Sequence, residues 1–90
     1  ISVSSAYPNP FNNQTNILIE LPKESYLAIK IYNLKGELVR ALLDEKKSAG
    51  NYSINWDGKG DHSSYVSSGT YLLQIRAENY NKISKIILLK

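Results

Sequence analysis

The sequence predicts an all-β protein, folded as a seven-stranded antiparallel β-sandwich. Apolar and polar residues alternate with a period of two along several segments, which is the pattern of strands that bury one face. Turn residues separate these segments about every 8–12 residues, and no window shows the 3.6-residue period of an amphipathic helix. Seven short strands in 90 residues suit an immunoglobulin-like sandwich. The analogy is architectural, because the chain has no cysteine and so lacks the Cys-Trp-Cys pattern of antibody domains.

The first strand is expected over residues 1–6, and the stiff segment that follows ends it. This segment, which we call the clamp, consists of Tyr7, Pro8, Asn9, Pro10 and Phe11. Proline cannot donate a hydrogen bond to a sheet, and it pushes the preceding residue toward extended geometry. The clamp is therefore expected to end one strand, cross between the sheets and start the next, with Tyr7 and Phe11 burying their rings to fix it. Residues 1–14 would then form the linker-side first strand and clamp of a single domain spanning residues 1–90.

Three further strands are expected before the middle of the chain. Residues 15–21 and 26–32 alternate in polarity, and a turn at 22–25 separates them. The second of these strands is expected to place Leu27, Ile29 and Ile31 inward and Ala28, Lys30 and Tyr32 outward. Residues 37–43 are apolar on both faces, so a short helix competes with a strand there.

The second half begins with a polar loop at 44–50 and contains three more expected strands, at 51–56, 70–77 and 82–89. Residues 57–68 form the longest irregular stretch. Two packed sheets would bury a core of inward-facing positions, namely Ile17, Ile19, Ile29, Ile31, Ile54, Trp56, Tyr71, Leu73 and Ile75. Each large apolar side chain contributes about 1.5–3 kcal/mol on burial, so a core of this size can hold the fold without disulfides.

Composition argues against several classes of function. The net charge is +3, and the basic residues are scattered along the chain rather than gathered as in a nucleic-acid binder. No apolar run approaches the ~18–20 residues that cross a bilayer, so no transmembrane segment is expected. The first residues lack the charged and apolar regions of a signal peptide. For an exported protein we therefore expect the signal peptide on a segment outside this sequence.

The residues that could carry chemistry do not form a catalytic motif. His62, the single histidine, lies in a polar loop beside Asp61 and two serines, whereas a working triad is assembled from separated segments. Asp57 and Asp61 have a spacing seen in calcium loops, but the EF-hand pattern fails at Lys59 and Ser68. We therefore expect no enzyme and no cofactor. A looser calcium site at Asp57 and Asp61 is the weaker alternative to a turn-stabilising role.

The aromatic residues leave carbohydrate binding open as an alternative. The chain has seven tyrosines, one tryptophan and one phenylalanine. Four of the tyrosines are candidates for exposed rings on which a sugar could stack: Tyr26, Tyr32, Tyr65 and Tyr80. Tyrosine is also favoured in strands for packing reasons, and the one tryptophan occupies a core-facing position. A sugar-binding module is therefore a weaker hypothesis.

Five motifs in order resemble the C-terminal sorting domain of type IX (Por) secretion substrates. They are the clamp with residues 12–15, Ile29 to Gly36, Ser48 to Gly58, Val66 to Tyr71, and Lys85 to Lys90. Each motif alone is weak, but five in order across one short chain are a strong signal. The same module is similar to the immunoglobulin-like domain of the flagellar hook-capping protein. One departure lies in the loop after Gly58, where His62 and two serines stand in place of an acid-rich turn with a further glycine.

This resemblance implies a non-catalytic C-terminal domain that directs secretion and cell-surface attachment of an upstream, covalently linked passenger. Its partner would be the outer-membrane secretion machinery, reached through the periplasm. Carried over by position, the recognition candidates are Gly69, Tyr71, Lys85 and Lys90, and the structural motif comprises the clamp with Trp56, Asp57 and Gly58. For Gly69 and Tyr71, a turn and a core position explain the residues nearly as well, and lysines also guard edge strands against aggregation. The alternative is a structural spacer or assembly domain of a larger extracellular protein, which the same fold allows.

Overall fold

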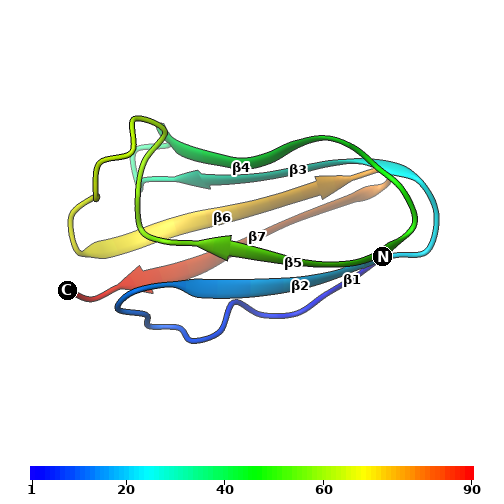
Figure 1. Cartoon of the computed structure of the whole chain (residues 1–90). Coiled ribbons are helices and arrows are strands. Elements are labelled where there is room, and N and C mark those ends of the chain that lie inside the picture. The colour runs from blue at the N-terminus through cyan, green and yellow to red at the C-terminus, as the bar shows by residue number, and fades with distance from the viewer.

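The chain folds into two antiparallel sheets packed face to face (Figure 1). The structure is a computed structural model that describes all of residues 1–90. The first sheet has the order β1 (Ser2–Val3), β2 (Thr15–Leu21), β5 (Gly50–Trp56). The second has the order β4 (Leu38–Lys47), β3 (Ser25–Tyr32), β6 (Gly69–Ala77), β7 (Tyr80–Leu88). The predicted seven-stranded, all-β, immunoglobulin-like sandwich is confirmed. The chain contains no helix of the length and apolarity that a membrane span requires.

The core lies between the sheets and follows the period-two pattern. The predicted members Ile17, Ile19, Ile29, Ile31, Trp56, Tyr71, Leu73 and Ile75 are all buried. Leu21, Leu27, Ile86 and Leu88 join them. The exception is Ile54, which is only half-buried. It belongs to β5, the edge strand of the smaller sheet, where no further strand covers its flank.

The segment that was ambiguous between strand and helix is a strand, and it is longer than expected. β4 continues through Asp44 to Lys47, because these residues pair with the start of β3, with Ser25 opposite Lys47. The predicted loop at 44–50 is therefore wrong in extent, and only Ser48 and Ala49 connect β4 to β5. Two register shifts interrupt the pairing of β3 with β4. Irregular pairing of this kind is common at sheet edges, which explains the mixed face pattern.

Two smaller expectations differ from the structure. The first strand pairs regularly only over Ser2–Val3, although Ser4 and Tyr7 still hydrogen-bond to β2. Ala28 faces outward as expected but is buried. It lines a hollow together with the longer side chains of Tyr26, Lys30 and Arg76, which shield it from solvent.

The two ends of the chain lie at opposite ends of the sandwich (Figure 1). Ile1 lies beside the turn that joins β2 to β3 and the turn that joins β6 to β7. At the other end are the clamp, the 57–68 loop and the last residues.

Candidate functional site

The clamp ties the first sheet to the second. Tyr7 exchanges two backbone hydrogen bonds of 3.0 Å with Asn16 of β2, in the first sheet. Four residues later the Phe11 N–H donates to the carbonyl of Ile87 at 2.9 Å, and Leu89 N–H donates to the Phe11 carbonyl at 2.8 Å. Phe11 therefore pairs in parallel with the end of β7, in the second sheet. The clamp therefore crosses from the first sheet to the second, as expected from the sequence.

Asn9 covers part of the β7 edge with its side chain. Its Nδ2 donates to the Lys85 carbonyl at 2.9 Å, and its Oδ1 accepts from the Ile87 N–H at 3.0 Å. A side-chain amide has the same donor and acceptor groups as a peptide bond. Asn9 thus acts as one more strand residue at a place where proline on either side removes the backbone donor.

The two rings of the clamp have different environments. Phe11 is 2% exposed, whereas Tyr7 is 79% exposed. The expectation that both rings are buried is right for Phe11 and wrong for Tyr7. The Tyr7 backbone pairs with Asn16 of the first sheet, and its side chain is left in solvent. The clamp also lies beside Leu88 and Leu89, at the end of the sandwich away from Ile1.

Phe11, Trp56 and Tyr71 form an aromatic cluster in the core. The Trp56 ring lies 5.3 Å from that of Phe11 and 5.4 Å from that of Tyr71, measured between centroids. The Tyr71 hydroxyl donates to the carbonyl of Ser67 at 2.6 Å, four residues upstream. This is the arrangement known as a tyrosine corner in immunoglobulin-like domains. It gives Tyr71 a packing role, whereas its candidacy for recognition is untested.

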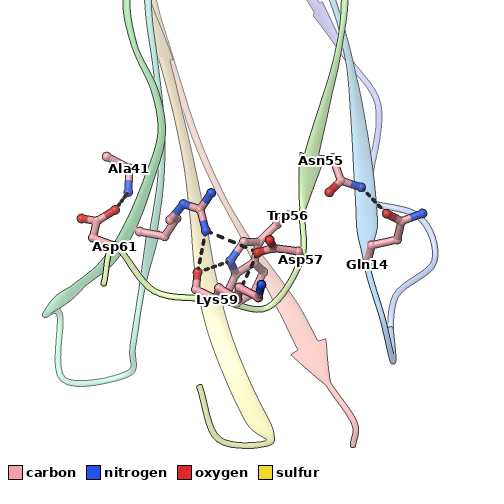
Figure 2. A network of polar contacts seen from close by, with 8 residues as sticks. Gln14, Ala41, Asn55, Trp56, Asp57, Lys59 and Asp61 are labelled. Carbon is pink, nitrogen blue, oxygen red and sulfur yellow. Dashed lines mark hydrogen bonds and ion pairs between the residues drawn. The ribbon is translucent and has the colours of Figure 1, made fainter. Parts of the chain in front are cut away.

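The loop after β5 is braced around Asp57, as Figure 2 shows. The Asp57 carboxylate accepts from the Lys59 N–H at 3.1 Å and from the Arg40 guanidinium at 3.3 Å. The Lys59 carbonyl accepts from the Trp56 indole N–H at 2.9 Å and again from Arg40, at 3.1 Å. Gly58 has a φ of +77°, a conformation that L residues with a side chain rarely adopt. The Trp-Asp-Gly motif therefore closes a turn and links it to β4.

Asp61 is directed at the edge of β4, away from Asp57 (Figure 2). Its carboxylate accepts from the Ala41 N–H at 3.0 Å, and its own N–H donates to the Val39 carbonyl at 3.0 Å. It therefore covers two backbone groups of an edge strand. The chain has no group of three or more acidic, histidine or cysteine side chains positioned to hold a metal ion. Calcium binding at Asp57 and Asp61 stays the weaker of the two predictions for this loop.

Two of the remaining recognition candidates, Gly69 and Lys90, lie together at the end of the β6–β7 hairpin that is away from its turn. Gly69, with a φ of +151°, begins β6 opposite Leu88. Lys90 lies beside it, since its N–H donates to the Ser68 hydroxyl at 3.0 Å. The Lys90 ammonium donates to the Val66 carbonyl at 2.8 Å and lies 4.4 Å from the centroid of the Tyr65 ring. Lys85 is exposed on β7, on the strand that Asn9 covers.

The other singled-out residues do not converge on one place. His62 is exposed and makes no side-chain hydrogen bond. Among the tyrosines considered as sugar platforms, Tyr26 and Tyr65 are exposed, whereas Tyr32 and Tyr80 are half-buried. Tyr26 and Tyr65 come from different parts of the fold and do not line one hollow. The contacts that sequence reasoning missed are those of Asn9 and Asp61 with strand edges.

The fold and these contacts define the class of the molecule first: a small immunoglobulin-like β-sandwich whose polar side chains brace turns and strand edges. A family described as "Secretion system C-terminal sorting domain" matches residues 5–89, and the chain belongs to this family. Membership implies a C-terminal sorting signal for type IX secretion, and hence an exported protein that is secreted or attached to the cell surface. Domains of this family are generally non-catalytic. Membership also implies contact with secretion machinery and an upstream passenger.

Solved structures with the same fold include two type IX secretion components. Dimeric latent PorU from Porphyromonas gingivalis is similar with a TM-score of 0.75 and 20% identity over 94% of this chain. PorZ from the same organism is described as an essential bacterial surface component of the type-IX secretion system. It is similar with a TM-score of 0.67 and 17% identity over 96% of this chain. FlgD from P. aeruginosa is similar with a TM-score of 0.60 and 19% identity, and the match covers 88% of this chain and 70% of FlgD. This chain spans only 9% of PorU and 11% of PorZ. A comparison with curated proteins found no match.

Proposed function

We propose that this chain is a folded, non-catalytic tag that an outer-membrane translocon recognises on the periplasmic side. Through it, an upstream passenger would be carried out of the cell and attached to the cell surface. The family match over residues 5–89 is the observation that carries this proposal.

The position of the two termini supports the proposal. The passenger would join at Ile1, at the end of the sandwich formed by the β2–β3 and β6–β7 turns. Gly69 and Lys90 lie together at the opposite end. Because the sandwich keeps the two ends apart, a bulky passenger would not cover these residues. We propose that Lys85, Lys90 and the turn at Gly69 form the surface that the translocon reads, with Tyr71 holding that turn from within the core.

The contacts of the acidic residues support a non-catalytic role. The Asp57 carboxylate is engaged by Arg40 and the loop backbone, and Asp61 is engaged by the edge of β4. A general acid or base must be free to exchange a proton with a substrate, and it is commonly oriented by a third group. His62 has no such partner. We propose that Asp57 and Asp61 stabilise the loop and bind no metal.

A transplant experiment tests the proposal. The whole chain is fused to the C-terminus of a periplasmic reporter with its own signal peptide, in a host that carries type IX machinery. We expect the reporter outside the cell or on its surface, and we expect it to remain in the periplasm of a host that lacks the translocon. A reporter that stays in the periplasm of the competent host, while the fused domain is folded and protease-resistant, would refute the proposed function and favour a structural spacer.

Two lysine substitutions then locate the reading surface. Lys90→Ala and Lys85→Ala are expected to reduce export, because each removes an exposed charge from the proposed surface. Lys23→Ala is the matched control, since Lys23 is also exposed but belongs to the β2–β3 turn near Ile1. Equal export of all three variants would place the reading surface elsewhere on the domain.

A further inference from the structure

The first half of the β7 outer edge has no hydrogen-bond partner. Both backbone groups of Ile87 bond to the clamp, so they point away from β6. Outward-pointing residues alternate along an antiparallel strand, so Lys85, Ile83 and Asn81 point the same way. The Asn9 side-chain amide donates a hydrogen bond to the Lys85 carbonyl. The Lys85 N–H and both backbone groups of Ile83 and Asn81 are left without a partner within the chain.

The clamp sets the limit of this open edge. Phe11 and Asn9 cover β7 from Leu89 back to the Lys85 carbonyl, and no residue covers it further toward Tyr80. An uncovered edge presents a row of donors and acceptors on which another extended chain can pair. The clamp's own pairing with β7 shows that this edge accepts an added segment in parallel orientation.

The side chains along this edge are apolar and basic. Ile83 is 59% exposed, a large apolar residue on an open strand. Lys85 lies on the same face of β7 as Ile83, and Arg76 of the adjacent β6 lies opposite Asn81, in a hollow that it shares with Asp44 and Glu78. Neither β6 nor β7 contains an aspartate or glutamate. The surface therefore complements a strand that carries acidic and apolar side chains, and it repels a basic one.

The other sheet edges offer less. On the β5 edge, the outward side chains are the neutral residues Asn51, Ser53 and Asn55, which provide neither an apolar anchor nor charge. The β4 edge is interrupted by Asp61 at Val39 and Ala41, and the strand has two register shifts in its pairing. Bulges and covering groups are devices that block strand addition.

We propose that the open edge of β7, Asn81 to Lys85, binds an extended acidic polypeptide segment, which adds to the second sheet as a further strand beyond β7. The Asn81 and Ile83 backbones pair with the segment, Ile83 packs against one of its apolar side chains, and Lys85 attracts its carboxylates. A second copy of this chain is a poor occupant, because its β7 strand would bring lysines and no carboxylate to pair with the lysines of this one. This inference rests on the proposed function and extends its recognition surface from Lys85 along β7 toward the β6–β7 turn, since it gives the chemistry of a translocon segment that would contact the tag.

Nuclear magnetic resonance with the isotope-labelled domain tests the binding directly. The probe is a synthetic peptide of alternating glutamate and valine, and the control peptide carries lysine in place of glutamate. We expect the first peptide to shift and protect the amides of Asn81, Ile83 and Lys85, and the second to leave them unchanged. No shift at these amides with millimolar acidic peptide, equal binding of both peptides, or a dimer of the domain formed through β7 would overturn the inference.

Ile83→Pro is the decisive variant, because the Ile83 N–H points away from β6 and its loss spares the existing ladder. It should remain folded and bind the acidic peptide at least about tenfold more weakly, since it lacks one backbone donor and adds bulk at the edge. Ile83→Ala keeps the backbone groups and should bind more tightly than Ile83→Pro. A folded Ile83→Pro variant that binds like the unmodified domain would contradict strand addition.

Export of the fused reporter separates this inference from the proposed function. If the unmodified tag exports its reporter and folded Ile83→Pro exports it equally well, the edge is not the reading surface, although the tag function stands. If the unmodified tag fails to export while the acidic peptide still binds the edge, the proposed function fails and the binding site remains.

Discussion

Replacing Phe11 by alanine is expected to remove a large part of the domain's stability. The Phe11 ring is 2% exposed and lies 5.3 Å from the Trp56 ring, between centroids. It is the one side chain that anchors the clamp in the core, because Tyr7, Pro8 and Pro10 are exposed. Without the ring, a cavity opens beside Trp56, and the backbone pairing of the clamp with β7 loses its support.

The magnitude follows from the burial. Phenylalanine-to-alanine changes at buried positions cost about 3–5 kcal/mol of unfolding free energy. A domain of 90 residues has a total stability of about 5–13 kcal/mol, at roughly 0.05–0.15 kcal/mol per residue. The substitution should therefore remove between a quarter and most of the stability. At about 4–8 °C per kcal/mol, Tm should fall by roughly 12–40 °C.

Urea unfolding followed by Trp56 fluorescence measures this change, with Tyr7→Ala as the matched control from the other end of the clamp. Tyr7 is 79% exposed, so its loss should change the unfolding free energy by less than about 0.5 kcal/mol. Similar costs for the two variants, or a Phe11→Ala cost below about 1 kcal/mol, would show that the clamp is not held through the core ring.

Three further predictions concern polar contacts. Asn9→Ala should destabilise the domain by about 1–3 kcal/mol and speed hydrogen exchange at the Ile87 amide, because it removes two hydrogen bonds to β7. Unchanged hydrogen exchange at this amide would contradict the role of Asn9 in covering the β7 edge. Tyr71→Phe should cost about 0.5–1.5 kcal/mol in urea unfolding through loss of the bond to the Ser67 carbonyl, and a neutral result would mean that water or a neighbour replaces it. Calcium ions should leave Tm unchanged in the unmodified domain and in Asp61→Ala alike, with Asp61→Ala itself about 1–2 kcal/mol less stable from the freed β4 edge. A calcium-dependent rise in Tm that Asp61→Ala abolishes would instead establish a metal site.

Much of the fold could be predicted because its cause is local. In a strand, residues two apart share a face, so Ile17 and Ile19, or Leu73 and Ile75, identify the buried side without knowledge of any partner. Trp56 followed by Asp57 and Gly58 predicts the end of a strand and the start of a turn. The family resemblance also rests on local motifs in order, which explains why it could be recognised before the structure.

The candidate site was less predictable because its contacts are remote in sequence. Asn9 bonds to Lys85 and Ile87, which are 76 and 78 residues away. Nothing in the neighbourhood of Asn9 distinguishes an edge cover from an ordinary turn residue. The same holds for Asp61, whose carboxylate accepts from the Ala41 N–H of β4, 20 residues away.

The sequence by itself determined that this chain forms two-faced strands, closes them into a sandwich and belongs among sorting domains, because alternation and motif order are properties of the chain alone. Only the tertiary structure decided which of two equivalent-looking rings, Tyr7 or Phe11, enters the core, and which strand edge stays open. Both outcomes depend on how the two sheets lie relative to the clamp. That arrangement is set by packing between segments distant in sequence, which no local pattern encodes.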